Sequence, residues 1–317
     1  MMYRQITAPE RYTLMALSVQ GLGPAAIARA LGRHRSTITR EMRRNRTRHD
    51  GYYRPQLADW YARGRRSCSR RNQRFTPADW ARVDRLLCDD WSPEQIAGWL
   101  RRHRILAISH ETIYRHLWTD KANGGVLYQH LRGAHKQRRK RYGAYDSRGR
   151  LAGKRPITAR PAAVEARSQI GHWEGDTVLG AGPSGPCVLT LVERKTGYLA
   201  LGKLRHRTGA EVNHRARRLI EQQPHAVRTV TVDNGTEFHR YAALERVVGA
   251  RFYFATPHHA WERGTNENTN GLLRQYLPKR ASMAHLTQPD CNRIATQLNR
   301  RPRKRLGFRT PEECYVP

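Results

Sequence analysis

The sequence has few cysteines, and no arrangement of them suits a metal. The five cysteines among the 317 residues are scattered at positions 68, 88, 187, 291 and 314. There is no Cys-x-x-Cys pair, and no grouping of Cys and His has the spacing of a zinc site. This pattern argues against a zinc finger or a disulfide scaffold. It favours free thiols in a reducing compartment.

Long apolar runs are also missing. No stretch approaches the roughly 18 consecutive apolar residues that a membrane-spanning helix needs. The N-terminal residues Met-Met-Tyr-Arg-Gln-Ile-Thr lack the apolar core of a signal peptide. We therefore expect a soluble, intracellular protein with no membrane partner.

Acidic residues are scarce compared with basic ones. The chain has 59 Lys and Arg against 26 Asp and Glu, which gives a net charge of +33. The excess is larger in residues 1–160 than in residues 161–317. Because each Lys or Arg placed at a phosphate releases counterions, this excess favours a nucleic acid as partner. An Arg-rich proteome would explain the preference for Arg over Lys but not the net charge.

The first part of the chain has the pattern of a helix-turn-helix. Helical spacing of Tyr12, Met15, Ala16 and Val19 predicts a first helix that begins at Thr7 or Pro9. A second helix, residues 24–31, has proline in its first turn. Gly32 then makes the turn into a third helix from Ser36 or Thr37.

The third helix is the candidate recognition helix. Ile38 and Met42 are expected to face inward. The outward side chains can reach base edges and phosphates. These candidate DNA contacts are Arg35, Ser36, Thr39, Arg40 and Arg43. The alternative is a plain three-helix bundle with a basic, solvated face.

A second helix-turn-helix pattern follows, with helices expected from Thr76, from Ser92 and from Ser109. Ile113 and Leu117 are expected to face inward from the last of these. Its candidate DNA contacts are His110, Thr112, Arg115 and His116. This copy is less basic than the first, so a structural or dimerising role is a serious alternative.

After about residue 165 the periodicity becomes strand-like. Strands are predicted over 172–179, 187–192 and 198–203, then a helix, a strand, a helix, a strand and two helices. The order βββαβαβα indicates a mixed sheet with helices on its faces. The predicted organisation is therefore multidomain: helix-turn-helix domains at 1–50 and 75–125, basic linkers at 51–74 and 126–164, and an α/β domain at 165–317.

Three acids in the α/β region form the candidate site. Asp233 directly follows a β-branched strand, and Asn234-Gly235 breaks that strand. Glu267 comes after 33 intervening residues, on a polar helix, and Asp176 lies upstream. Two magnesium ions held by carboxylates can serve both ends of an in-line displacement at a phosphodiester. A lone Asp at a strand end is usually a cap or turn former, but clustered acids in so basic a protein need a cation or a basic partner.

Two further acids compete for the same assignment. Glu174 and Asp176 are two residues apart on one strand face, so alternation does not separate them. Glu237 lies about one helical turn beyond Asp233. The residues by themselves leave these alternatives open.

Several motifs together resemble one family. They are His-Trp-Glu-Gly-Asp-Thr at 172–177, Asp-Asn-Gly-Thr-Glu-Phe at 233–238 and Glu-Arg-Gly-Thr-Asn-Glu-Asn at 262–268, with the tail at 298–307 and Thr-Pro-Glu at 310–312. Over nearly the whole chain they resemble the DDE transposases of the bacterial insertion-sequence-thirty family. The resemblance implies an α/β ribonuclease-H-like catalytic domain, an integrase catalytic core, and two Mg²⁺ ions that Mn²⁺ can replace.

The resemblance also implies partners and a location. The partners are double-stranded DNA, both the terminal inverted repeats of a mobile element and its target, and further copies of the chain in the DNA complex. The location is the bacterial cytoplasm, in association with the nucleoid.

The resemblance assigns roles residue by residue. Asp176, Asp233 and Glu267 become the catalytic metal ligands, which leaves Glu174 and Glu237 as structural acids. Arg274 fits a basic position seven residues after Glu267, close to two helical turns, where it can hold a DNA phosphate.

The loop before Glu267 carries His258, His259 and Arg263. These side chains can touch DNA, but a plain loop role is equally compatible with the sequence.

Three functions compete on this basis. The first is a transposase that nicks at element ends and uses the exposed 3′-hydroxyl to attack target DNA. The second is a catalytically inactive helix-turn-helix regulator, against which stands the retention of all three acids. The third is an RNA nuclease of the same fold. A recognition helix fits the major groove of DNA and not the narrow one of RNA, which favours DNA.

Overall fold

A computed structural model describes residues 5–47, 49–68, 74–132, 153–182, 185–257 and 259–317. The contacts divide the chain into two units, residues 1–80 and 81–317. Residues 133–152 of the predicted linker at 126–164, and His258, lie outside the described residues. No helix in the described ranges is long and apolar enough to cross a membrane.

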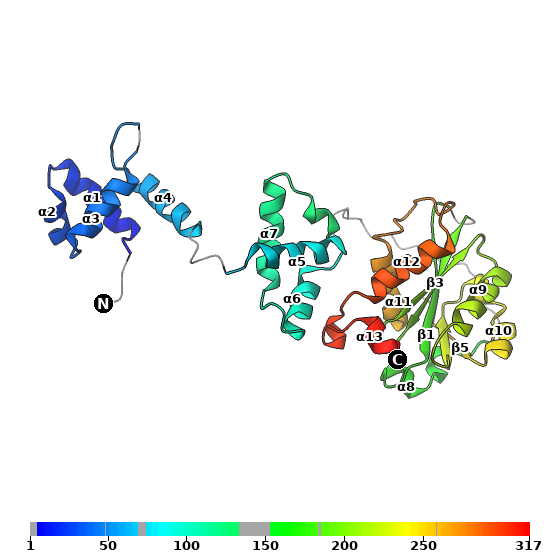
Figure 1. The fold of residues 1–317 in the computed structure, drawn as a ribbon. Helices are drawn as coiled ribbons and strands as arrows, with labels where there is room; N and C mark the ends of the chain where they lie inside the picture. Colours follow the sequence, from blue (N-terminus) through cyan, green and yellow to red (C-terminus); the bar gives the residue numbers. More distant parts are fainter. Residues whose placement is uncertain (1–4, 48, 69–73, 133–152, 183–184, 258) are drawn as a thin grey trace. The chain divides into compact units, whose positions relative to one another are not determined.

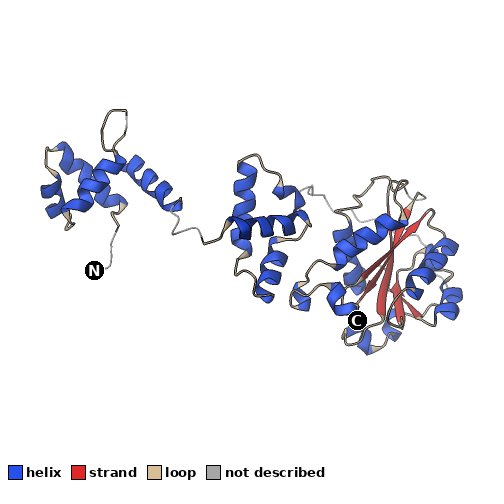
Figure 2. Ribbon diagram, in the orientation of Figure 1, coloured by secondary structure: helices blue, strands red, loops and turns tan. Residues whose placement is uncertain are grey.

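The first unit contains four helices around one core (Figures 1 and 2). They are α1 (Ala8–Val19), α2 (Pro24–Ala30), α3 (Arg35–Asn45) and α4 (Pro55–Ser67). Thr7 begins α1 with a capping box, in which its side chain and that of Glu10 each accept the other's backbone N–H. Gly32 makes the turn before α3 with a φ of +60°, a region that favours glycine. The predicted three-helix arrangement is confirmed.

The fourth helix corrects the predicted linker over 51–74. Tyr53 and Ala58 are buried in the same core as Leu14, Ile27 and Ile38. The pattern of Leu57, Trp60 and Tyr61 predicts a helix here, and α4 confirms it, but the burial of Tyr53 and Ala58 was not predicted. The segment up to Ser67 is therefore part of the first folded unit and not a linker.

The inner face of α1 also differs from the prediction. Tyr12 is 48% exposed and Val19 is 78% exposed, whereas Leu14 and Arg11 are buried. The guanidinium of Arg11 is 2.6 Å from Glu41 and forms a second ion pair with an aspartate of α4. Counting apolar residues chose the wrong face because a paired arginine occupies the core position.

Three more helices follow: α5 (Pro77–Cys88), α6 (Pro93–Arg102) and α7 (His110–Ala122), with the short turn η2 (Leu127–His130). Ile113 and Leu117 face inward as predicted. Within the second unit, α6 is joined to the end of the chain, since Gln95 Nε2 donates to the carbonyl of Pro302 at 2.9 Å. Lys304 Nζ also lies 2.7 Å from Glu94.

The predicted linker over 126–164 is folded at both of its described ends. η2 packs against α7, and further on come η3 (Ile157–Ala159) and α8 (Ala162–Glu165). Ile157 and Val164 are buried, and Pro156 bridges to Phe254 of the sheet. These few apolar anchors pack on distant sequence, which is why composition alone assigned them to a linker.

A five-stranded mixed sheet forms the rest of the second unit (Figure 2). Its strands are β1 (His172–Leu179), β2 (Cys187–Glu193), β3 (Leu199–Leu204), β4 (Thr229–Val232) and β5 (Arg251–Phe254). The order is β3-β2-β1-β4-β5: β1 to β3 run antiparallel, and β4 and β5 run parallel to β1. This is the predicted ribonuclease-H-like arrangement.

The remaining helices complete the predicted order. They are α9 (Gly209–Glu221), η4 (Thr236–Phe238), α10 (Tyr241–Val248), η5 (Ala260–Arg263), α11 (Gly264–Leu273), α12 (Gln288–Asn299), η6 (Lys304–Leu306) and α13 (Pro311–Tyr315). The five cysteines are free, as expected, and two of them are buried.

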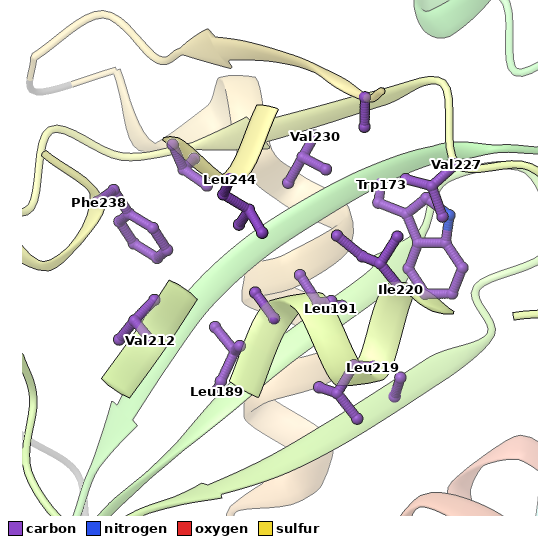
Figure 3. Packing of buried hydrophobic residues seen from close by; sticks show 14 of the residues in the cluster. Trp173, Leu189, Leu191, Val212, Leu219, Ile220, Val227, Val230, Phe238 and Leu244 are labelled. Carbon is purple, nitrogen blue, oxygen red and sulfur yellow. The ribbon is translucent and has the colours of Figure 1, made fainter. Parts of the chain in front are cut away.

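Helices cover both faces of the sheet and make two cores. Figure 3 shows the first, where side chains of α9 and α10 such as Val212 and Leu244 pack on Leu189, Leu191 and Val230 of the strands. The second core lies beneath α11 and α12. Because β2 is buried on both sides, its sequence is a nearly unbroken apolar run.

Alternation along β1 decides which side of the sheet carries the acids. Trp173 belongs to the first core and Val178 to the second. Glu174 and Asp176 share the face of Val178, since successive side chains point to opposite faces. Both acids are therefore directed toward α11.

Candidate active site

Asp176 lies in the middle of β1, the central strand. Its Oδ2 accepts a hydrogen bond from Asn270 Nδ2 of α11 at 2.8 Å, and its Oδ1 accepts the Thr177 N–H at 2.9 Å. The side chain is 22% exposed. These contacts hold the carboxylate at the junction of β1 and α11 while leaving part of it accessible.

Asp233 directly follows β4, the parallel neighbour of β1. Its Oδ1 accepts the Gly235 N–H at 2.9 Å, which fixes the sharp turn after the strand. Arg263 lies against both acids, with Nη1 3.9 Å from Asp176 Oδ1 and Nη2 3.7 Å from Asp233 Oδ2. The structure thus brings the first two predicted acids to opposite sides of one guanidinium.

The Asp176 carboxyl is hard to ionise in this position. Burial raises its pKa to about 6, and the charge of Asp233 adds to that effect, although Arg263 opposes it. The nearest basic side chain, Arg263, lies against both carboxylates. Its single positive charge balances only one of their two negative charges.

We expect Asp176→Asn to stabilise the protein at neutral pH without divalent metal. Between about pH 4 and 6 the folded carboxyl keeps a proton that the unfolded one loses, so the free energy of unfolding falls as pH rises through this window. The Asn variant lacks this loss, and at pH 8 it should be more stable by up to about 3 kcal/mol. Urea denaturation at pH 4 and pH 8 in chelator measures both values. A variant less stable than the parent at pH 8 would contradict the assigned burial.

Glu267 lies in the first turn of α11 and its side chain is exposed. Among the described residues, no three His, Cys, Asp or Glu side chains are close enough to hold a metal, so Glu267 is not gathered with the two aspartates. It is nevertheless on the helix that borders them, one turn before Asn270. The structure therefore places two of the three acids together and the third on an adjacent element.

Three residues of α11 and its C-cap, four positions apart, bond to residues of β1. The Asn266 N–H donates to Glu174 Oε2 at 2.8 Å, Asn270 donates to Asp176, and Arg274 Nη1 donates to the Leu179 carbonyl at 3.0 Å. Residues four apart lie on one helix face. This face fastens α11 to β1 and sets the position of Glu267 relative to the strand.

Glu174 has a structural role, which separates it from Asp176. It is fully buried, and Arg194 Nη1 lies 2.5 Å from its Oε1. Its other oxygen accepts the Asn266 N–H near the start of α11, where a negative charge is favourable. α11 has no side-chain cap of its own, so Glu174 supplies from β1 what the helix lacks.

We expect Glu174→Ala to lower the free energy of unfolding by about 3–5 kcal/mol, because it leaves the Arg194 charge buried without its closest partner. Chemical denaturation of the full chain measures this. The control is Glu221→Ala, which removes an exposed i,i+4 pair with Arg217 and should change stability by less than about 1 kcal/mol. Equal effects of the two substitutions would contradict the structural role.

Glu237 lies on the other side of the sheet. Its carboxylate is 2.8 Å from Arg207 Nε and accepts a hydrogen bond from Thr177 Oγ1 at 2.8 Å. Burial acts to raise its pKa, but the hydrogen bonds from Arg207 and Thr177 outweigh burial and the pKa lies below its usual value. Glu237 is thus a paired acid, as expected for a structural residue.

Arg274 forms the C-cap of α11 and is half-buried. Its Nη1 donates to two backbone carbonyls, those of Leu179 and Leu277, and Asp176 exerts a favourable field on its charge. These bonds tie the end of α11 to the end of β1. The phosphate contact predicted for Arg274 remains a prediction.

The candidate recognition surface of α3 has the expected orientation. Ile38 and Met42 are buried, and Ser36 is half-buried at the start of the helix. The exposed side chains are Arg35, Thr39, Arg40 and Arg43. Arg40 Nε donates to the Ser36 carbonyl at 3.0 Å, so its side chain lies along the helix. The DNA contacts themselves remain predictions.

Two of the four candidate DNA contacts on α7 make contacts within their own unit. His110 and Arg115 are exposed, but Thr112 is half-buried at the Ser109 cap. His116 Nε2 lies 2.7 Å from Asp84 of α5, so this side chain joins two helices. The DNA contact predicted for His116 remains a prediction.

Two site residues were missed from the sequence. Asn270, which holds Asp176, follows Glu267 by three residues, and this helical spacing was an available signal. Lys154 donates to Asn234 Oδ1 at 2.9 Å; burial lowers its pKa, and the charge of Asp233 opposes that shift. Nothing local in the sequence around Lys154 points to this position.

The chain thus combines a helix-turn-helix region with a mixed sheet whose two faces are covered by helices. Residues 2–45 match the family model described as a helix-turn-helix domain, and residues 37–117 match a homeodomain-like domain. The transposase for insertion sequence element IS4351 of Bacteroides fragilis is 38% identical, over 99% of this chain and 96% of its own length.

Further relatives agree. Transposase InsI for IS30A of Escherichia coli (strain K12) is 38% identical over 97% of this chain and 82% of its own length. The transposase for IS1086 of Cupriavidus metallidurans is 37% identical over 98% and 93%. The chain belongs to the IS30 family of transposases, as its motifs indicated.

One solved structure is also similar, at a TM-score of 0.35 and 20% identity. It is the catalytic core domain of BIV integrase, and the match covers 46% of this chain and 93% of that one.

Proposed function

We propose that this transposase binds the terminal inverted repeats of an insertion sequence, cleaves DNA at the element ends and joins the exposed 3′-hydroxyl to target DNA. The observation that carries the proposal is the pairing of Asp176 and Asp233 on neighbouring parallel strands, around one guanidinium. α11, fastened to the same central strand, carries the third acid of the motif. The relatives named as transposases support this reaction class.

The donor set fits a divalent metal. Asp176 and Asp233 both lie against the guanidinium of Arg263, and burial raises the pKa of Asp176, so a divalent cation bound there would favour the ionised carboxylates. Carboxylate oxygens are the ligands that Mg²⁺ prefers, and Mn²⁺ accepts the same set. Asp176, Asp233 and Glu267 would hold the metal. Bound there, it would activate the attacking oxygen and stabilise the leaving oxygen of the phosphodiester.

The surrounding side chains position these acids. Asn270 orients the Asp176 carboxylate, and the Gly235 N–H orients that of Asp233. Glu174, buried and paired with Arg194, holds the first turn of α11 and so fixes where Glu267 can reach. Such fixed partners keep ligands in a productive geometry without large rearrangement.

The helical regions provide the DNA contacts in this proposal. α3 presents its basic exposed face for the major groove, and a copy of the chain at each inverted repeat would make the active complex a homo-oligomer. The net charge of +33 supports a polyanionic partner.

The direct test is incubation of the full chain and Mg²⁺ with a fragment that carries the DNA flanking its own reading frame. We expect nicks at the element ends, followed by joining to a second duplex. The matched control is the same fragment with both ends scrambled. Specific binding with no cleavage in either Mg²⁺ or Mn²⁺ would favour the alternative, a catalytically inactive DNA-binding regulator.

A further inference from the structure

Arg263, one of the loop side chains that the sequence suggests can touch DNA, lies against the two aspartates of the candidate site. It is the last residue of η5 and the N-cap of α11, and its side chain is 14% exposed. Within the described residues its side chain makes one hydrogen bond, from Nη1 to the Gly175 carbonyl at 2.9 Å. Gly175 lies in β1 between Glu174 and Asp176. The guanidinium therefore lies directly over the part of β1 that carries the acidic site.

The two ion pairs of Arg263 are loose. Their N–O distances are 3.9 Å to Asp176 and 3.7 Å to Asp233, whereas charge-assisted hydrogen bonds in proteins are about 2.7–2.9 Å long. The buried pairs that stabilise this protein are much closer, for example Arg11 with Glu41 at 2.6 Å and Arg194 with Glu174 at 2.5 Å. The field of the two acids thus attracts Arg263 without locking it to either one.

The Arg263 side chain takes no part in the bonds of Asn266, Asn270 and Arg274 that fasten α11 to β1. α11 begins without a side-chain cap, and the next residue, Gly264, has open space where a side chain would be. The segment lies at a junction of two helix types, where hydrogen bonding is incomplete. Arg263 can therefore turn away from the acids without disrupting the fastening of α11 through Asn266 and Asn270.

Two charged ligands of the proposed site, the metal and the DNA phosphate, would affect Arg263 in opposite ways. A guanidinium and a divalent cation have the same sign, so they compete for the carboxylates of Asp176 and Asp233. A DNA end brings a phosphate, for which a guanidinium is a well-matched bidentate partner and an ammonium is a poorer one. One mobile arginine can respond to both ligands in turn.

We propose that Arg263 is an exchangeable counter-ion: it balances Asp176 and Asp233, is displaced when they bind a divalent metal, and then holds a phosphate of the DNA end. This rests on the proposed function, because it takes the two aspartates as metal ligands. Arg263 thus competes with the metal for the two carboxylates and is a binding residue for DNA.

The test measures how tightly the parent and each variant bind Mn²⁺ and Ca²⁺, by calorimetry on the full chain without DNA. Removing the competing charge with Arg263→Gln or Arg263→Ala should tighten Mn²⁺ binding about tenfold at low ionic strength. Arg263→Lys keeps the charge and should bind Mn²⁺ as the parent does. Arg246→Ala removes an exposed arginine of α10 whose Nε donates to the backbone, and it is the matched control with no expected change.

DNA cleavage gives the second readout. Despite tighter metal binding, Arg263→Gln and Arg263→Ala should cut at least about tenfold more slowly, mainly through a higher KM for the DNA end. Arg263→Lys should recover part of that loss. Tighter metal binding together with weaker catalysis is a pair of effects that a purely structural residue does not produce.

Each other outcome overturns a stated part. Unchanged or weaker Mn²⁺ binding in both uncharged variants would show that Arg263 does not compete with metal. Parental KM and rate in those variants would remove the phosphate contact. If Asp233→Asn bound Mn²⁺ as the parent does, the metal site itself would be wrong, and the proposed function would fail rather than the role of Arg263.

Discussion

Replacing Asp233 with Asn should reduce strand cleavage by about 10³-fold or more and leave DNA binding at the parental level. The side chains have nearly the same shape, so the change removes one negative charge from the pocket and little else. A catalytic metal contributes several kcal/mol to the reaction, and each 1.36 kcal/mol corresponds to a factor of ten. Cleavage and joining of labelled element ends, with binding measured in the same buffer, separates the two effects.

The same result is expected for Asp176→Asn and Glu267→Gln. The control is Glu221→Gln, which neutralises an exposed acid on α9 and should leave the rate unchanged. Parental cleavage by Asp233→Asn would show that the catalytic assignment is wrong. Because Glu267 is not gathered with the aspartates, its variant is the sharpest: an active Glu267→Gln beside two inactive aspartate variants would require a different third ligand.

Binding to element ends should fall steeply with salt. If about 6–10 Lys and Arg side chains contact phosphates, affinity drops roughly 10³–10⁵-fold between 50 and 200 mM salt. Arg40→Ala and Arg43→Ala, on the exposed face of α3, should each weaken binding and reduce the salt slope by about one. Titrations of the full chain over this salt range provide the measurement.

The structure also indicates where a fragment that binds the element ends should stop. The first unit includes α4, so a fragment ending after residue 74 keeps the whole core, while one ending at residue 50 loses Tyr53 and Ala58. We expect the longer fragment to bind the ends specifically and the shorter one to fold poorly. Equal specificity in a fragment of residues 165–317 would contradict this division of labour.

The sheet could be predicted because its strands carry their signal locally. β2 is apolar on both faces, and β4 is a β-branched run that ends at Asp233, so neither needs a distant partner to be recognised. Helix starts were equally local, since Thr7 and Ser92 form capping boxes within three residues.

The features that could not be predicted from the sequence share a different cause. Arg11 is buried because acids 30 and 48 residues away pair with it. Glu174 and Asp176 lie on one strand face, and only the pairing of Glu174 with Arg194, which follows the next strand, distinguishes them. Arg263 contacts Asp176, which lies 87 positions earlier in the chain (263 − 176 = 87). Whether a charged side chain is buried depends on the residue that pairs with it. When that residue is distant in the sequence, the local pattern of apolar and polar residues does not reveal the burial.

The contact between α6 and the end of the chain has a consequence for synthesis on the ribosome. The hydrogen bond from Gln95 cannot form until Pro302, 207 residues later, has been synthesised. At a translation rate of about 5–20 residues per second, this takes about 10–40 s. The first unit has no such delay, since Gln5 meets Arg66 after 61 residues. Each new chain therefore passes through a period in which the first helical unit is complete while the three acids proposed as metal ligands are still being translated.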